Sequence, residues 1–110
     1  MTSSREERLA ENEVVFRAAN ERVARWEERH AEADAELYYC ECASEGCREK
    51  IALREAEYES VRADPTHFVL VSGHEIPDIE SVVEEHEGWV VVEKNPETHH
   101  IVEPADERTN

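Results

Sequence analysis

The first third of the chain has the spacing of polar and apolar residues that is typical of a long amphipathic helix. From Ser4 to Leu37 the sequence contains no glycine or proline, and glutamate, arginine and alanine dominate it. Apolar residues recur every three or four positions, and seven of the nine positions in this series are apolar. The series consists of Leu9, Asn12, Phe16, Ala19, Val23, Trp26, His30, Ala33 and Leu37. We therefore predict a long helix within residues 1–39, with Ser3 or Ser4 as its N-cap.

A helix of this length would form a rod of ~50 Å, which is longer than a compact domain of this size requires. Its apolar stripe must then be covered by the rest of the chain, by a second copy in a coiled coil, or by another protein. Asn12 and His30 interrupt the stripe. If these two residues are buried, they would set the register of a coiled coil. If they lie at the edge of the stripe, they would face solvent, which costs less free energy. We expect a protein partner or a homodimer to contact this helix.

After Leu37 the pattern changes to short segments. Tyr38-Tyr39-Cys40 consists largely of β-favouring residues and is expected to form a strand before a turn at 43–46. In chain order we expect a strand at 50–53, a helix at 54–62, a buried strand at 68–71, a helix at 77–86 and a second buried strand at 89–92. Pro77 is placed to begin the second of these helices and Gly88 to end it.

These elements place the chain in the α+β class. The expected organisation is one domain, with the long helix in residues 1–39, a small α+β core in residues 40–102 and a flexible acidic tail in residues 103–110. The strand–helix–strand unit at 68–92 is compatible with a parallel crossover, but the pattern leaves the direction of its strands open.

The strong negative charge of the chain excludes some classes of binding partner. The 110 residues include 12 basic and 28 acidic side chains, for a formal net charge of −16. Such a surface repels the phosphates of nucleic acids and anionic membranes, so we expect neither as a direct partner. No apolar stretch approaches the ~20 residues that cross a bilayer. The first residues lack the apolar segment of a secretory signal, and the expected location is the cytoplasm.

The clearest chemical signal is a group of three cysteines, Cys40, Cys42 and Cys47, within eight residues of a chain that has no others. Their number is odd and the expected compartment is reducing, which argues against a disulfide framework. In an extended segment the Cys-x-Cys spacing places both sulfurs on one side, and a turn at Gly46 can bring Cys47 to them. Three thiolates at this spacing favour a zinc site over free thiols or a redox switch, with iron as the other metal to consider.

A structural zinc site requires a fourth ligand, and the chain offers six histidines. We favour His74, because it follows the end of a predicted buried strand, where side chains from loops converge. His67, just before the same strand, is the next candidate, and the adjacent pair at 99–100 follows. A neighbouring carboxylate, Glu75 or Glu41, is expected to orient the ligand imidazole.

Three thiolate ligands are typical of a closed structural site, whereas hydrolytic zinc sites are rich in histidine and keep one position open. The zinc deaminases do use cysteines, but their His-x-Glu and Pro-Cys-x-x-Cys motifs are absent here. The chain also has no glycine-rich phosphate loop and no Gly-x-Ser-x-Gly motif. We therefore expect a non-enzymatic protein and assign no catalytic residue.

Two resemblances add to this interpretation. Cys40-x-Cys42-x4-Cys47 has the spacing of the post-SET zinc segment of histone methyltransferases, which implies the geometry of a zinc site and not methyl transfer. The chain as a whole resembles a family of short, acidic, uncharacterised actinobacterial proteins. The segments that match are Glu11-Asn12-Glu13, Cys40-Glu41-Cys42-Ala43, the run from Glu57 to Pro65, Gly73-His74-Glu75 and Val91-Val92-Glu93-Lys94. This second resemblance implies that the Gly-His-Glu segment accompanies the cysteines, which favours His74, and it implies no activity.

The leading hypothesis is a non-enzymatic zinc-binding interaction or regulatory module. One structural zinc ion would fix the small sheet, and the long helix would contact a partner or a second copy. The first alternative is a thiol-based redox or zinc-level sensor, in which oxidation releases the metal and the helix rearranges. The second alternative is a small metal-dependent enzyme, which would require an exchangeable water on the metal.

Overall fold

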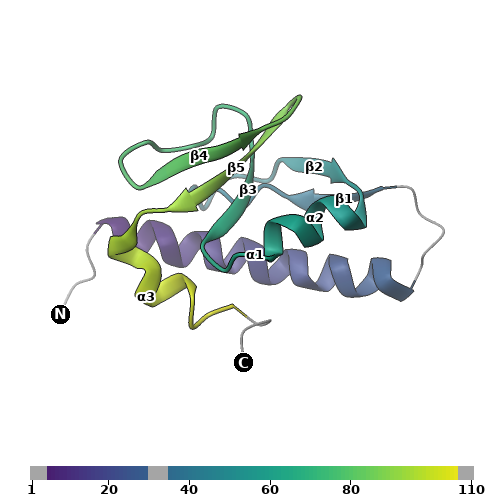
Figure 1. Cartoon of the computed structure of the whole chain (residues 1–110), viewed down its shortest axis with the longest axis horizontal. Coiled ribbons are helices and arrows are strands. Elements are labelled where there is room, and N and C mark those ends of the chain that lie inside the picture. Colours follow the sequence, from purple (N-terminus) through teal and green to yellow (C-terminus); the bar gives the residue numbers. More distant parts are fainter. Residues whose placement is uncertain (1–4, 30–34, 107–110) are drawn as a thin grey trace.

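In the computed structural model, which describes residues 5–29 and 35–106, helices and strands are mixed along the chain as the α+β class requires (Figure 1). The elements are α1 (Arg5–Arg29), β1 (Glu36–Tyr39), β2 (Lys50–Leu53), α2 (Glu55–Arg62), β3 (His67–Val71), β4 (Glu80–Glu85), β5 (Trp89–Lys94), the 3₁₀ turn η1 (Pro96–Thr98) and α3 (His99–Val102). The predicted fold class is confirmed. The strands predicted at 50–53, 68–71 and 89–92 and the helix predicted at 54–62 are all present.

The described strands form two antiparallel sheets. β1 and β2 pair as a hairpin, and residues 40–49 form the loop between them. In the second sheet β5 lies in the middle, with β3 on one side and β4 on the other. The backbone amide of Glu41 donates to the carbonyl oxygen of Val69 at 2.8 Å and joins the hairpin loop to β3. The strand direction that the sequence left open is therefore antiparallel.

The long helix α1 runs along one side of the strands, and α3 packs beside its N-terminal half (Figure 1). Among the described residues, no helix combines the length and the apolar character that crossing a membrane requires.

The predicted N-terminal helix is too long. α1 ends at Arg29, and Glu36–Tyr39 is strand β1. Residues 36 and 37, which we assigned to the helix, are therefore strand, whereas the strand character predicted for Tyr38 and Tyr39 is confirmed. The ring of Tyr38 is fully buried and stacks on Tyr58 of α2, with ring centroids 4.3 Å apart. This packing and the pairing with β2 outweigh the helix propensity of the segment. The residues of that prediction that lie outside the described ranges are Ser3, Ser4, His30 and Ala33.

The helix predicted at 77–86 is also wrong. The segment contains strand β4, whose Val82 pairs with Val92 of β5, and Gly88 takes a φ of 87° in the connection between the two strands. A helix would have needed Val82 and Val83 on its buried face, but they are 38% and 44% exposed. Pairing with β5 satisfies the backbone hydrogen bonds of β4, and this tertiary interaction outweighs the local start and stop signals of a helix.

The face of α1 that the rest of the chain covers is largely polar. Its buried residues are Ala10, Glu13, Arg17, Asn20, Glu21 and Ala24. This line is offset by one residue, or about 100° around the helix, from the apolar series that begins at Leu9. The described members of that series are only half-buried, or exposed in the cases of Trp26 and Leu37. The apolar stripe is therefore not the face that packs on the rest of the chain.

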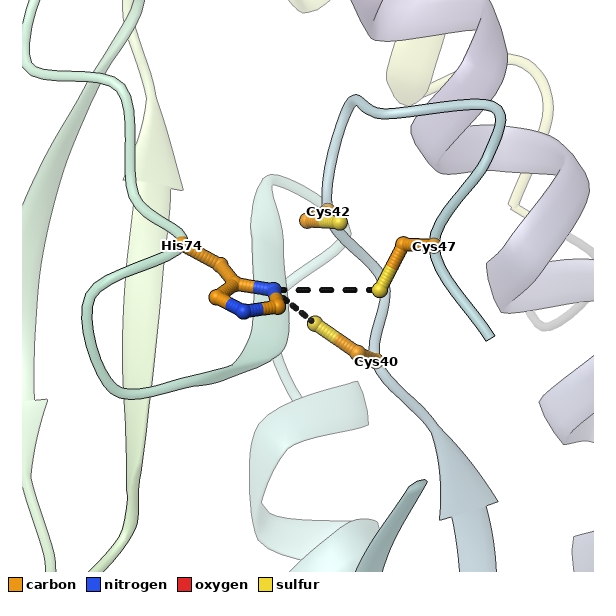
Figure 2. Close-up of side chains that lie close together, drawn as sticks. All are labelled: Cys40, Cys42, Cys47 and His74. Atoms are coloured by element: carbon orange, nitrogen blue, oxygen red, sulfur yellow. Dashed lines mark hydrogen bonds between the residues drawn. The ribbon is translucent and has the colours of Figure 1, made fainter. Parts of the chain in front are cut away.

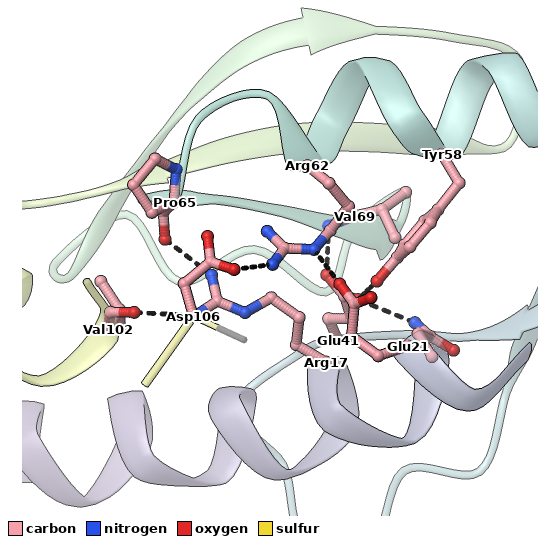
Figure 3. A network of polar contacts seen from close by, with 10 residues as sticks. Arg17, Glu21, Glu41, Tyr58, Arg62, Pro65, Val69, Val102 and Asp106 are labelled. Atoms are coloured by element: carbon pink, nitrogen blue, oxygen red, sulfur yellow. Dashed lines mark hydrogen bonds and ion pairs between the residues drawn. The ribbon is translucent and has the colours of Figure 1, made fainter. Parts of the chain in front are cut away.

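Two arginines lie at the centre of this polar interface (Figure 3). The guanidinium of Arg62, on α2, is 2.6 Å from Glu21 Oε1 and also pairs with Asp106. The guanidinium of Arg17 donates to two backbone carbonyl oxygens at 2.6 and 2.7 Å. These partners offset the cost of burying the charges. Asp106 belongs to the predicted flexible tail, and its buried ion pair instead anchors the described part of that tail to α2.

A second buried group of charges lies where α1 meets β4 and β5. Lys94 Nζ is 2.6 Å from Oε1 of Glu13 and 3.2 Å from Oε1 of Glu80, and all three side chains are fully buried. One ammonium group cannot neutralise two carboxylates. Burial and the charge of Glu80 raise the pKa of Glu13 well above that of an exposed glutamate. Folding therefore favours the protonated form of Glu13.

We predict that Glu13→Gln flattens the pH dependence of stability. A carboxyl group whose pKa is raised by folding favours the folded state at low pH. That contribution is lost as the pH rises from about 4.3, the pKa of an unfolded glutamate, through the raised value. Glutamine keeps the shape of the side chain and an acceptor for Lys94 without the charge. Urea unfolding at a series of pH values should show the wild type losing stability relative to the variant as the pH rises.

The matched control is Glu11→Gln, at an exposed position of the same helix, which should follow the wild type. If Glu13→Gln were less stable than the wild type by the same amount at every pH, the raised pKa of Glu13 would be contradicted.

Candidate metal centre

The three cysteines lie on the loop between β1 and β2, whose two ends are held together by backbone hydrogen bonds. The amide of Cys40 donates to the carbonyl oxygen of Glu49 at 2.9 Å, and the amide of Cys47 donates to that of Ser44 at 3.1 Å. Cys40 and Cys42 are buried, and Cys47 is half-buried. The hairpin thus places all three thiols in one short loop.

His74 approaches this loop from a distant part of the sequence. It follows β3 in a turn where its amide donates to the carbonyl oxygen of Val71 at 3.0 Å. Gly73 has a φ of 93° in this turn, a conformation that glycine adopts without steric cost. The predicted ligands Cys40, Cys42, Cys47 and His74 come together here, with their ligand atoms within 4.8 Å of one another (Figure 2).

The spacing of the ligand atoms matches a tetrahedral zinc site. His74 Nδ1 is 3.5 Å from Cys40 Sγ and 3.7 Å from Cys47 Sγ. With Zn–S bonds of about 2.3 Å and Zn–N bonds of about 2.05 Å, a tetrahedral angle gives an S···N separation of about 3.6 Å. The two separations are therefore compatible with the binding of all three atoms to one ion.

Glu49 orients the imidazole of His74. Its Oε2 lies 2.9 Å from Nε2 of His74, so Nε2 carries the proton that it donates and Nδ1 is left to face the thiols. A carboxylate that holds the second ring nitrogen in this way is the usual companion of a zinc-bound histidine. We predicted Glu75 or Glu41 for this role, and that prediction is wrong. Glu75 accepts a hydrogen bond from the amide of Gly73 instead.

Glu41 lies between two of the cysteines in sequence, but its carboxylate lies in the protein interior. Oε1 accepts from the amide of Val69 at 3.0 Å, and Oε2 accepts from Tyr58 at 3.0 Å and from Asn20 at 2.8 Å. Burial raises the pKa of Glu41, and the hydrogen bonds of Asn20 and Val69 oppose this shift. Glu41 therefore joins the cysteine loop to α1, α2 and β3.

Each thiol also accepts a hydrogen bond from a backbone amide. Val71 N donates to Cys40 Sγ at 3.2 Å, and the amides of Ser44 and Glu49 donate to Cys42 and Cys47. Such hydrogen bonds stabilise thiolates over thiols, because they favour the charged form. The backbone of the loop and of β3 thus offers one hydrogen bond to each sulfur.

Without a metal, the thiols share their protons unequally. The thiol of Cys40 donates to Cys42, and this hydrogen bond lowers the pKa of Cys42 to about 5. The same hydrogen bond, with burial, raises the pKa of Cys40. Burial raises the pKa of Cys47. One thiolate therefore forms readily near neutral pH, and a cation that binds the group would displace the two remaining protons.

The cluster lies at the base of a surface depression of about 370 Å³, which is lined in part by Cys42, Cys47 and His74. A metal ion can reach the ligands from this side. Four protein ligands complete the tetrahedral coordination of zinc, so no position is left for a reacting water. The chemistry that this donor set favours is tight binding of a thiophilic cation.

The other histidines of the described residues have different surroundings, and His67 does not contact the cysteines. Their nearest polar or aromatic partners are Asp64 and Glu93 for His67, Trp89 and Glu84 for His86, the carbonyl oxygen of Lys94 for His99 and Glu7 for His100. His74, and not His67, is therefore the histidine that lies with the three cysteines.

Comparison of the chain with protein-family models, with curated proteins and with solved structures gave no match.

We predict that Glu49→Ala lowers the zinc affinity of the cluster about 10- to 100-fold, because the imidazole loses the acceptor that orients it. Competition with a chromophoric zinc chelator measures this affinity. Glu45→Ala removes an exposed carboxylate from the same loop and is the matched control. Equal affinities in the two variants would show that Glu49 has no part in orienting His74.

Proposed function

We propose that this protein is a non-enzymatic zinc-binding module in which one structural zinc ion joins the cysteine loop to the turn after β3. The observation that supports this most strongly is the spacing of the ligand atoms, since His74 Nδ1 lies 3.5 and 3.7 Å from two sulfurs. The ligands come from both sheets, so an ion bound here would fix the β1–β2 hairpin against β3. Its binding free energy would then contribute directly to folding.

A structural role is favoured over a catalytic one by three features of the site. The three thiolates and one imidazole use all four zinc positions. The sulfurs accept backbone hydrogen bonds, which hold them in fixed positions in the loop. The nearest carboxylate, that of Glu49, is engaged by His74 and is not placed as a free general base.

We predict that the purified protein retains one tightly held zinc ion per chain and that Cys42→Ser and His74→Ala lose it. At free zinc of roughly 1,000 times the Kd, an ion that binds only the folded chain stabilises it by about 4 kcal/mol. The wild type should therefore unfold at a markedly lower temperature after chelation, and the two variants should no longer respond to zinc. Metal analysis and thermal unfolding by circular dichroism measure these effects.

His86→Ala is the matched control, because it removes an exposed histidine that lies away from the cysteines. It should keep both the zinc and the response to chelation. A wild-type protein that unfolds at the same temperature with and without zinc would contradict the proposed structural role.

We also propose that the side of α1 left uncovered by the fold forms a protein contact, in its simplest form with a second copy of the chain. Val15 is 66% exposed and adjoins the half-buried Phe16. Both line a cleft of about 280 Å³ between α1 and the cysteine loop, together with Asn12, Glu45 and Arg48. The predicted length of the helix first suggested a partner, but α1 is shorter than predicted. The proposal now depends on this exposed surface.

Self-association through this surface should depend on both Val15 and salt. Because each chain has a net charge of −16, two copies repel one another, and salt should strengthen the dimer by screening that repulsion. We predict that sedimentation at rising protein concentration detects a wild-type dimer that Val15→Glu abolishes and Arg22→Glu, at another exposed position of α1, leaves intact. A wild-type protein that stays monomeric at high salt would contradict self-association.

A further inference from the structure

A second group of metal-binding residue types lies at the opposite end of β3 from His74. His67 is the first residue of β3, and Glu93 is its cross-strand partner on β5. Asp64 lies in the turn between α2 and β3, and its backbone carbonyl accepts from the amide of His67 at 3.0 Å. One ligand atom from each of these three side chains lies within 4.8 Å of the others. The strand β3 thus has one candidate metal group at each end.

The distances in this group are longer than those of ordinary hydrogen bonds and are compatible with ligands around one ion. His67 Nε2 is 3.4 Å from Asp64 Oδ2 and 3.6 Å from Glu93 Oε1. Both separations exceed the usual hydrogen-bond range of about 2.7–3.2 Å. A tetrahedral ion with bonds of about 2.05 Å to nitrogen and oxygen separates its ligand atoms by about 3.4 Å.

Histidine–carboxylate pairs elsewhere in the structure show the contrast. The ring nitrogens of His74, His86 and His100 lie 2.9, 3.0 and 3.1 Å from the oxygens of Glu49, Glu84 and Glu7, which are ordinary hydrogen-bond distances. His99 lies farther, 3.9 Å, from a single carboxylate, that of Glu103. His67 instead faces two carboxylates at once and approaches neither of them to that distance.

The carboxylate of Asp64 is held in a fixed orientation. Its Oδ1 accepts from the amide of Thr66 at 2.9 Å and from the hydroxyl of Thr66 at 2.7 Å. This leaves Oδ2 directed at His67. Hydrogen bonding of the remote oxygen is how proteins orient a carboxylate that binds a metal.

The charge of the group is also unbalanced. Two carboxylates face one imidazole, and within residues 5–29 and 35–106 neither Asp64 nor Glu93 forms an ion pair with a lysine or an arginine. The side chain of His67 is 20% exposed, and those of Asp64 and Glu93 are 43% and 46% exposed, so a cation can enter from solvent. A divalent cation would neutralise both carboxylates and leave the imidazole neutral.

We propose that Asp64, His67 and Glu93 bind a second divalent cation, of the class that combines imidazole and carboxylate ligands, with zinc as the reference ion. Three protein ligands leave at least one position for water, in contrast to the closed cysteine centre. The site is weaker than the cysteine centre because it has no thiolate and is half-exposed. It does not rest on the proposed structural zinc, since the two groups share no residue.

The test is isothermal titration calorimetry, in which zinc is added to protein whose cysteine centre already holds one zinc ion. The wild type should bind one further equivalent, and His67→Ala and Glu93→Gln should each lose it. Thr66→Val, which removes one hydrogen bond to Asp64 but no ligand, should weaken it about 10-fold or more. His86→Ala, which removes a histidine paired with a single carboxylate, should bind the second ion as the wild type does.

The imidazole resonances of His67 report the location independently, and they should shift in step with the second equivalent and not with the first. Any weak zinc binding to the acidic surface would persist in His67→Ala, so the difference between the two titrations isolates the site. The proposal is overturned if zinc never shifts the His67 resonances, or if both His67→Ala and Glu93→Gln bind as many equivalents of zinc as the wild type. Whether Cys42→Ser loses the tight ion tests only the cysteine centre and does not bear on the site at His67.

Discussion

Glu41 lies between two of the proposed zinc ligands, yet its carboxylate is fully buried and accepts hydrogen bonds from α1, α2 and β3. An ionisable group in the interior is stable only when such partners surround it. The alternation of side chains in an extended segment then decides the rest, because Glu41 points inward while Cys40 and Cys42 lie on the other side of the loop. Burial of the Glu41 carboxylate therefore anchors the loop to the core and also directs the sulfurs toward the turn after β3.

Much of the interior is built in the same manner. α1 packs on the strands and on α2 with a line of charged and amide side chains, and the arginines at positions 17 and 62 are each bound on several sides. Breaking one member of such a network leaves a buried charge without a partner, which costs more than a lost surface ion pair. Hydrogen bonds require a particular geometry. A polar interface of this kind therefore restricts the orientation of α1 as well as its distance from the strands. The apolar stripe of the helix is consequently left at the edge of the interface.

The candidate metal centre combines a local and a distant component. Three of its members lie within eight residues, and their spacing was sufficient to predict the group. His74 was predictable from its place at the end of a continuous apolar strand. Glu49 was not, although it lies in the same loop, because its position opposite the imidazole depends on how the hairpin packs against the second sheet. No pattern in the sequence distinguishes this glutamate from the others in the loop.

By itself, the sequence determined the α+β class, the strands β3 and β5 and the group of three cysteines with His74. Continuous apolar runs must be buried, and closely spaced thiols can converge without help from the rest of the fold. Only the tertiary structure decided that Glu80–Glu85 is a strand, that β1 begins as early as Glu36, that the polar line of α1 is its buried face, and that Asp106 is anchored to α2. In each of these cases the local preference of the segment is weak. The outcome depends on a strand or a charged partner that is distant in sequence and that becomes available only when the chain has folded.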